Sequence, residues 1–300
     1  MNIVEYARAE AIKSLFGMKC FNEAFATWGP EIKSIIRPNP DFYSLLGLGD
    51  SLGKIFKTTG TSGRGQGTLS AGGSCWEGLV CWYLNLCLMG SRTVVIKHSK
   101  KLIPPCIADA ITVNYGSFVS NTESDLVAIS FPNLNDYFQP IENFSCNGKF
   151  QYVDTINRLC TRDFDKLEVG IVQCKTNWND NAQIPMLWEI VYSSTGFSNR
   201  NISIGRNGFC MKDFKKFFYS FVTVPSNSLN YTTANLPVKR VYNLTGGNYW
   251  GRPTSSGVAQ SIKEIFNRNF GTSWVNGSQK KDVESQLANK ADLMYFNLTF

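Results

Sequence analysis

Two polar side chains, Gln173 and Lys175, end an otherwise apolar stretch that begins after Glu168. Residues i and i+2 of a β-strand point to the same face, so we expect these two side chains to project together from a strand end. An amide oxygen beside an ammonium suits a site that holds a metal ion, a water molecule and a phosphate group. The alternative is a solvated strand end without function. The rest of the sequence is needed to choose between these two interpretations.

The composition favours a globular protein and allows a polyanionic partner. The chain has 300 residues, 43% hydrophobic and 18% charged, which is typical of one or two domains with a sizeable core. Its net charge of +7 favours nucleic acid as a partner, although many basic proteins bind none. The nine cysteines contain no Cys-x-x-Cys pair. This argues against a structural zinc site and favours reduced thiols in a cytoplasmic protein.

The first residues and the hydropathy predict neither secretion nor membrane insertion. Glu5 and Glu10 interrupt an N-terminal segment that lacks a long apolar core, and no run of 18 apolar residues occurs. We therefore expect no membrane partner. The single histidine, His98, would have to serve any histidine-dependent hydrolase. Its lysine-rich surroundings favour a solvated loop residue instead.

The N-terminal part of the chain is predicted to be helical. In residues 1–57, apolar positions such as Ile12, Leu15 and Phe16 recur at helical spacing.

The next segment, residues 58–74, is rich in glycine and hydroxyl side chains and is predicted to be irregular. It is either a plain linker or a flexible loop that carries Arg64 near DNA. It lacks the Gly-Lys-Ser/Thr of a nucleotide-binding loop. A helix is then predicted from Ser74, which would cap it, with Glu77 as the partner in a capping box.

The remainder alternates between strands and helices, which predicts an α/β fold with a central sheet. Strands are predicted at 92–97, 125–131, 168–175, 201–205 and 219–224. The other predictions are a helix or turn at 104–116, an irregular insertion at 132–165, a helix at 181–192, a short basic helix at 211–218, a loop at 246–253 and a helix at 256–270.

The order of these elements resembles the PD-(D/E)xK nuclease superfamily, the fold of most type II restriction endonucleases. That family has a helix, three antiparallel strands, a helix and a further strand, so the resemblance implies a central mixed sheet flanked by helices. Its motif places an Asp at the start of one strand, and Glu or Gln, a spacer and Lys on the next. Here Asp125 would head the first strand, with Gln173 and Lys175 on the second and Glu77 on the preceding helix. The resemblance covers roughly residues 70–225.

The site residues leave alternatives open. Gln173 replaces the usual acid, so one metal ligand would be a neutral amide oxygen. Asp163 or Asp165 could supply the acid in place of Asp125, which we prefer because an apolar strand follows it directly. Glu77 would be either a metal ligand or only the capping-box partner.

The chemistry implied by the resemblance is metal-assisted hydrolysis of a phosphodiester. Mg²⁺ held by Asp125, Gln173 and Glu77 would neutralise charge on the phosphate and lower the pKa of a bound water. Lys175 would hold or deprotonate that water and contact the scissile phosphate. The expected catalytic set is therefore Asp125, Gln173, Lys175 and Glu77.

The resemblance further implies a sequence-specific double-stranded DNA endonuclease of a restriction system, acting as a homodimer. One alternative is a nucleic-acid-binding protein with a degenerate nuclease core, which the replacement at Gln173 favours. Another is a structural or regulatory α/β protein. The candidates for DNA contact are Arg64, Asn177, Asn179, Arg206 and Arg252.

The predicted domain organisation has three parts. A helical N-terminal region, 1–57, precedes a nuclease core at 58–225 with an insertion near 132–165, and residues 226–300 pack on the same domain.

Overall fold

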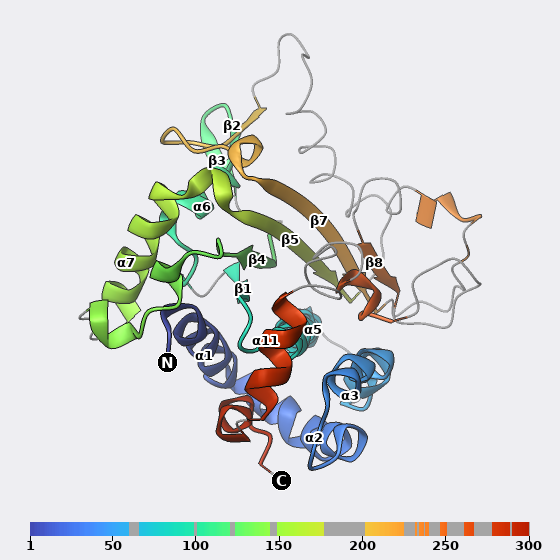
Figure 1. Ribbon diagram of the computed structural model, residues 1–300. Helices are drawn as coiled ribbons and strands as arrows, with labels where there is room; N and C mark the ends of the chain where they lie inside the picture. Colours follow the sequence, from blue (N-terminus) through green and yellow to red (C-terminus); the bar gives the residue numbers. More distant parts are fainter. Residues whose placement is uncertain are drawn as a thin grey trace.

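The chain has an α/β fold with a mixed central sheet and flanking helices, which confirms the coarse fold prediction (Figure 1). The computed structural model describes residues 1–59, 66–98, 101–120, 124–144, 149–176, 202–224, 232, 234–236, 238–239, 247–250, 261–266, 278–288 and 290–299.

Four helices form the N-terminal part, where the apolar spacing predicts helices. They are α1 (Ile3–Phe16), α2 (Lys19–Ile36), α3 (Phe42–Gly47) and α4 (Leu52–Lys57). Asn2 begins α1, because its side-chain oxygen accepts the Glu5 N–H at 2.7 Å. The division into three domain parts stays a prediction.

Helix α5 (Gln66–Cys87) begins eight residues before the predicted start, so the expectation of an irregular segment up to residue 74 was wrong for its second half. Gly72 and Gly73 lie within this helix and cost it some stability. Starting a helix fixes several residues for one hydrogen bond, whereas extending a formed helix gains one hydrogen bond for each residue fixed. Ser74 is thus an interior residue and not an N-cap, which also removes the predicted capping box with Glu77.

The central sheet has five strands in the order β1-β4-β5-β7-β8. They are β1 (Thr93–Lys97), β4 (Leu126–Ser130), β5 (Glu168–Lys175), β7 (Lys216–Thr223) and β8 (Gly247–Trp250). β4 is antiparallel to both of its neighbours, β1 and β5, whereas β5, β7 and β8 are parallel. A parallel pair cannot be joined by a tight hairpin, and residues 177–201 of the connection between β5 and β7 lie outside the described residues.

Three predictions for the connecting segments were wrong. The supposed insertion contains α7 (Lys149–Arg162), whose Tyr152, Ile156 and Cys160 are fully buried at helical spacing. The supposed basic helix at 211–218 is a short 3-10 turn followed by β7, which pairs with β5 from its first residue. The supposed loop at 246–253 contains the edge strand β8.

A smaller sheet and several short elements complete the described chain. The smaller sheet has the order β3-β2-β6 and consists of β2 (Val113–Tyr115), β3 (Phe118–Ser120) and β6 (Ile202–Ile204). The remaining helices are α6 (Pro105–Ala110) and α11 (Ser278–Leu287), with 3-10 turns at 48–50, 135–137, 141–144, 164–166, 211–213 and 290–296. None of the described helices is long and apolar enough to cross a membrane.

Two predicted helices cannot be compared with the structure in full. The one at 181–192 lies outside the described residues, and of the one at 256–270 only residues 261–266 are described, where they end in a short helical turn.

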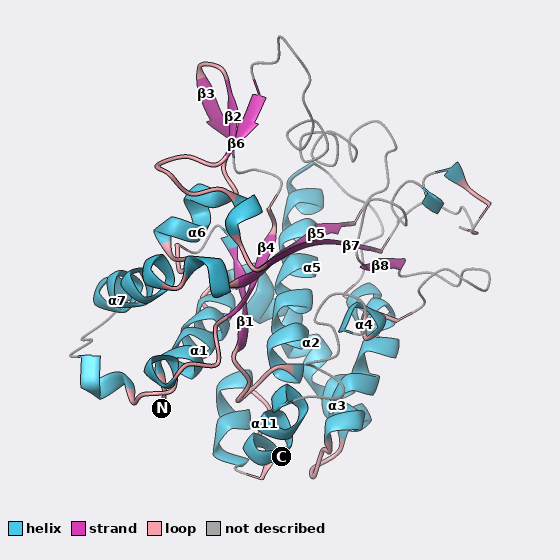
Figure 2. Cartoon of the chain, turned by 45° about the horizontal axis from the view of Figure 1, so that its top comes forward, coloured by secondary structure: helices cyan, strands magenta, loops and turns pink. Residues whose placement is uncertain are grey.

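Helices cover both faces of the central sheet (Figure 2). An apolar core lies on each face. One core lies between the sheet and α5, and we call this the α5 side; Val95, Leu126 and Val172 point into it. The other lies under α6 and α7, and we call this the α7 side; Ile96 and Val127 point into it. Because side chains alternate along a strand, every residue of β1, β4 and β5 is assigned to one side or the other.

Gly170 allows β5 and β7 to pack closely on the α5 side. It lies opposite Phe218 in the parallel register, and a Cβ at this position would lie 2.0 Å from the Phe218 ring. The ring therefore occupies the space that a side chain would fill, which holds the two strands in one register.

A buried arginine ties α1 to the beginning of β1. Arg8 is fully buried, and its guanidinium donates to Ser91 O and Thr93 O, each at 2.8 Å. Its charge is balanced by Glu5, whose Oε2 accepts the Arg8 Nε–H at 3.0 Å. Glu5 also accepts hydrogen bonds from Gly90 N and from the Tyr295 hydroxyl. The ends of the chain and the first strand are thereby fixed to one another.

Replacing this arginine with a neutral side chain of similar length tests the importance of the network. We expect Arg8→Met to lower the free energy of unfolding by about 3–5 kcal/mol, because it leaves the Glu5 carboxylate buried without its partner. Lys13→Met in the same helix is the control. Lys13 pairs with Glu10 at the surface, and its loss is expected to cost about 0–1 kcal/mol. Chemical denaturation measures both, and equal losses would show that the buried pair has no special role.

Candidate functional site

Asp125 lies directly before β4, next to the end of β5. Leu126 is paired with Val172 in the antiparallel register, so the preceding residue, Asp125, falls opposite Gln173. Its Oδ2 accepts the backbone N–H of Cys174 at 2.7 Å. Among the described residues this is the one hydrogen bond to the Asp125 carboxylate, so its other oxygen can contact a ligand.

Ionisation of the Asp125 carboxyl group is less favourable than in water. Burial raises the pKa of Asp125 to about 7, and the negative charge of Glu77 adds to the rise. The Lys175 ammonium, the Cys174 N–H and Lys97 oppose the shift but do not cancel it. Two acids close enough to raise a pKa in this way are a common feature of sites that bind a cation or exchange a proton.

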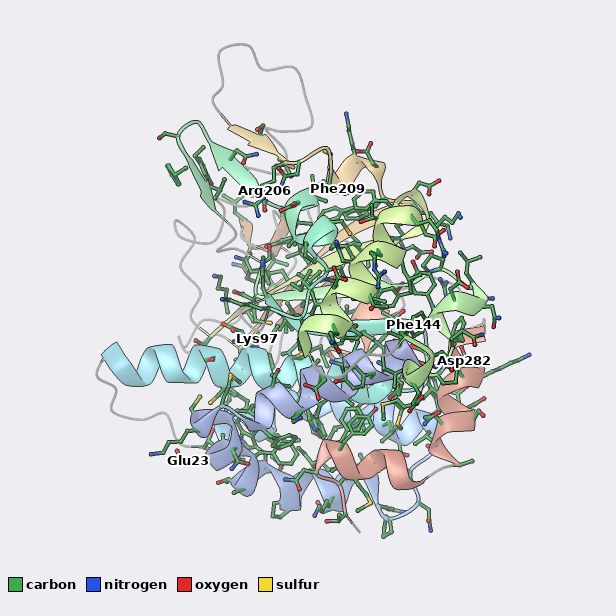
Figure 3. The ribbon with its side chains drawn as sticks, turned by 90° about the vertical axis from the view of Figure 1, so that its left-hand side faces the viewer. Glu23, Lys97, Phe144, Arg206, Phe209 and Asp282 are labelled. Carbon is green, nitrogen blue, oxygen red and sulfur yellow. The ribbon has the colours of Figure 1, made fainter. Side chains whose placement is uncertain are left out.

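Glu77 is bound to a lysine that the sequence analysis did not select. It forms an ion pair with Lys97, whose Nζ also donates to Ser74 Oγ at 3.2 Å. Lys97 is the last residue of β1 and is only 6% exposed. Figure 3 shows it beside α5. Lys97 lies two residues after Val95, so the sequence indicated that both side chains point to the same side of the sheet. The sequence did not indicate that Glu77 of α5 faces Lys97 on that side.

Gln173 and Lys175 belong to the other side of the sheet. Gln173 shares the α7 side with Ile171 and is fully buried, and its Oε1 accepts a hydrogen bond from the Tyr219 hydroxyl. Lys175 follows two residues later at the end of β5, on the same face, and is half-buried. The two side chains therefore share a face, as their spacing predicts.

The four predicted site residues meet at one end of the sheet, but they approach it from different sides. Glu77 comes from the α5 side, whereas Gln173 and Lys175 come from the α7 side. Asp125 lies at the beginning of its strand and is affected by charges from both sides.

The alternative acids lie at the other end of β5. Asp163 follows α7 and precedes the strand, and its carboxylate is bound by Arg162 at 2.6 Å and Lys166 at 2.9 Å. These cations hold the pKa of Asp163 below its usual value. Asp165 lies in the 3-10 turn just before the strand. From Glu168 to Gln173 an extended strand rises about 17 Å. Of these three acids, Asp125 is the one beside Gln173.

Arg206 is the single predicted DNA contact within the described residues. It forms an ion pair with Asp109, with Nε and Oδ1 separated by 2.6 Å, and remains partly exposed. Figure 3 shows it near Phe209, away from Lys97. Arg64, Asn177, Asn179 and Arg252 lie outside the described residues.

His98 is half-buried, so the expectation of a solvated loop residue was wrong. Its backbone N–H donates to Asp125 O at 3.1 Å, and its Nδ1 lies 3.2 Å from Ser124 O. These bonds continue the pairing of β1 with β4 by one residue. Burial lowers the pKa of His98 below its usual value.

No known family model matches this chain, and no similar sequence was found among curated proteins. In the described part of the chain, no group of three His, Cys, Asp or Glu side chains gathers at one point.

The raised pKa of Asp125 makes a specific prediction for stability. Between its ordinary value of 3.8 and about 7, the folded protein keeps a proton that the unfolded chain has lost. Asp125 therefore destabilises the fold increasingly as pH rises through this range. Asp125→Asn keeps an acceptor for the Cys174 N–H but removes the charge. We expect its free energy of unfolding, relative to wild type, to rise by about 1–2 kcal/mol from pH 5 to pH 8, because screening reduces the ~1.4 kcal/mol that each pKa unit represents.

Asp41→Asn serves as the control for this measurement. Asp41 caps α3, and hydrogen bonds from Ser44 lower its pKa, so it is ionised throughout this pH range in both states. Its effect on denaturation should not change from pH 5 to pH 8. An equally flat difference for Asp125→Asn would contradict a raised pKa at Asp125.

Proposed function

We propose that this protein is a Mg²⁺-dependent, sequence-specific double-stranded DNA endonuclease of restriction type, with a core similar to that of the PD-(D/E)xK nucleases. The observation that carries the proposal is the pairing of Asp125 with Gln173 at one strand end, with Lys175 two residues further on. An acid, an amide oxygen and a lysine in this arrangement are the groups that phosphodiester hydrolysis requires.

The order of the elements supports the proposal. α5 is followed by the three antiparallel strands β1, β4 and β5, and then by β7, parallel to β5. The helix and the three strands follow the order that the resemblance implies for them, with Asp125 directly before β4 and Lys175 at the end of β5.

The residues present fit a small divalent cation. Mg²⁺ prefers a few protein oxygens and several water molecules. Asp125 and Glu77 would provide the negative charge, and a bound cation would oppose the burial and the Glu77 charge that together raise the pKa of Asp125. Gln173 would offer its side-chain amide oxygen, which also accepts from the Tyr219 hydroxyl. Because Gln173 is fully buried and neutral, it would be a weaker ligand than Asp125.

Each residue then has a separate role in the reaction. A bound divalent ion would supply positive charge to the phosphate and a water of lowered pKa. The Cys174 N–H fixes the Asp125 carboxylate, and Lys97 orients Glu77. Lys175 would contact the scissile phosphate and stabilise the charge that develops there.

The proposed partner is double-stranded DNA, bound by a homodimer so that each strand meets one site. The net charge of +7 supports a polyanionic partner. The proposed DNA contacts remain Arg64, Asn177, Asn179, Arg206 and Arg252.

A second candidate function is supported by the surroundings of Gln173. This side chain is fully buried and hydrogen-bonded to Tyr219, as a structural glutamine would be. Together with the missing acid, this favours a nucleic-acid-binding protein with a degenerate nuclease core that does not cut.

Cleavage of plasmid DNA in the presence of Mg²⁺ tests the proposal. We expect discrete fragments from the wild-type protein and a loss of about 100-fold or more in rate for Lys175→Ala, because a charge aimed at the transition state is removed. Lys215→Ala is the matched control. Lys215 is an exposed lysine beside the other end of β5, paired with Glu168, and its loss should leave cleavage nearly unchanged.

Binding measurements on the same proteins separate the two candidate functions. Wild-type protein that retains DNA on a filter but produces no fragments with Mg²⁺ would favour the non-cleaving function. Fragments that form equally well with Lys175→Ala would contradict the role assigned to that lysine.

A further inference from the structure

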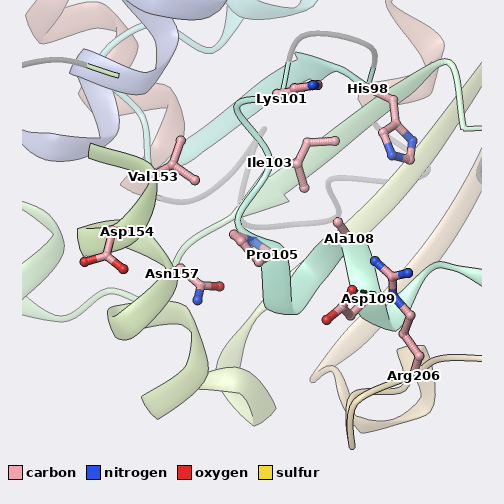
Figure 4. A pocket seen from close by; sticks show the side chains of 10 residues that line it. All are labelled: His98, Lys101, Ile103, Pro105, Ala108, Asp109, Val153, Asp154, Asn157 and Arg206. Carbon is pink, nitrogen blue, oxygen red and sulfur yellow. Dashed lines mark hydrogen bonds and ion pairs between the residues drawn. The ribbon is translucent and has the colours of Figure 1, made fainter. Parts of the chain in front are cut away.

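A pocket of about 540 Å³ opens on the α7 side of the sheet, next to the candidate site (Figure 4). Its walls come from the end of β1, from α6 and from α7. Ile103, Pro105, Ala108 and Val153 give these walls an apolar surface. The volume lies within the range of about 300–1,000 Å³ that is usual for sites that bind small organic groups.

His98 connects this pocket to Asp125. Its side chain lines the pocket, and its backbone N–H donates to Asp125 O at 3.1 Å. In the β1–β4 register, Lys97 pairs with Leu126, so His98 falls opposite Asp125. Asp125 in turn lies opposite Gln173. The three residues thus form one row across the sheet, with the pocket at its β1 end.

The hydrogen bond of the His98 ring fixes what the ring offers to a ligand. A carbonyl oxygen can only accept, so the Nδ1 that lies 3.2 Å from Ser124 O must carry a proton. In the neutral ring the other nitrogen, Nε2, is then an acceptor. A polar acceptor is therefore available on an otherwise apolar wall.

The other polar groups of the pocket balance in charge. Arg206 is paired with Asp109, and Asp154 forms an ion pair with Arg158 at 3.6 Å. Counted over the lining residues, the two acids Asp109 and Asp154 equal the two basic residues Lys101 and Arg206. Asn157 accepts the Cys106 N–H at 2.9 Å through Oδ1, which leaves its Nδ2 as a donor. Donors and acceptors without net charge around apolar walls match a flat, neutral, polar ring better than a phosphate group.

We propose that this pocket binds a nucleobase, supplied by the DNA that occupies the neighbouring site. The apolar walls would cover the faces of the ring, while His98 Nε2 and Asn157 Nδ2 would contact its edge. Bases can reach such a pocket when they leave the duplex stack. This inference rests on the proposed function for the DNA, but the pocket itself can be tested without any cleavage.

Calorimetric titration of the full chain with each of the four deoxynucleosides tests the pocket directly. We expect at least one of them to bind with a Kd of about 0.1 mM, the affinity usual for a ligand of this size. Deoxyribose without a base should not bind. Val153→Trp, which fills the pocket from α7, should weaken binding about tenfold or more, and Ala108→Met should do so from the opposite wall.

Val119→Trp is the control, because Val119 lies on β3, is 53% exposed and does not line the pocket. The absence of nucleoside binding, or binding that both pocket variants leave intact, would overturn the proposal. Unchanged affinity of both variants for duplex DNA would overturn the assignment to a base of the DNA and point to a free nucleoside. Nucleoside binding by a protein that neither binds nor cuts DNA would instead contradict the proposed function and leave the pocket in place.

Discussion

The antiparallel register of β4 and β5 is the constraint on which the candidate site depends. It sets Asp125 opposite Gln173 and brings the Cys174 N–H to the Asp125 carboxylate. A slip by one residue would turn every side chain of one strand to the other core. Gly170 resists such a slip between β5 and β7, because only a residue without a side chain leaves room for the Phe218 ring. The packing that holds the strands of the sheet in register therefore also places the residues of the candidate site.

The two acids near the β4–β5 strand end differ in how well their charges are compensated. Lys97 compensates Glu77 on the α5 side, while the Asp125 carboxylate is buried, with a single hydrogen bond among the described residues and an acid nearby. Such an arrangement lowers stability at neutral pH, and a bound cation would remove the penalty. Proteins commonly accept this kind of local instability at functional sites. In the proposed nuclease, this local instability would be the result of keeping an acid in place to bind a cation.

The sequence alone was sufficient for β1, β4, β5 and most of β7, and for the spacing of Gln173 and Lys175, but not for β8, which lies in a predicted loop. Runs of β-branched residues mark β1, β4 and β5, and period-two alternation assigns faces within each strand. It was not sufficient for contacts between distant segments. The ion pair of Lys97 with Glu77 and the hydrogen bond of Gln173 with Tyr219 depend on how helices and strands pack. The buried stripe of α7 was missed because the helix is polar on average, although Tyr152, Ile156 and Cys160 keep helical spacing.

The central claim is that Asp125 is a buried acid at a cation site. Its carboxyl carbon can be followed by NMR during a pH titration, with the signal assigned by its loss in Asp125→Asn. The titration midpoint should lie at about 7 without metal. Saturating Mg²⁺ should lower it by about one unit or more, because a bound cation stabilises the ionised form. A midpoint of about 4, the same with and without Mg²⁺, would show an ordinary solvated carboxylate and contradict the account.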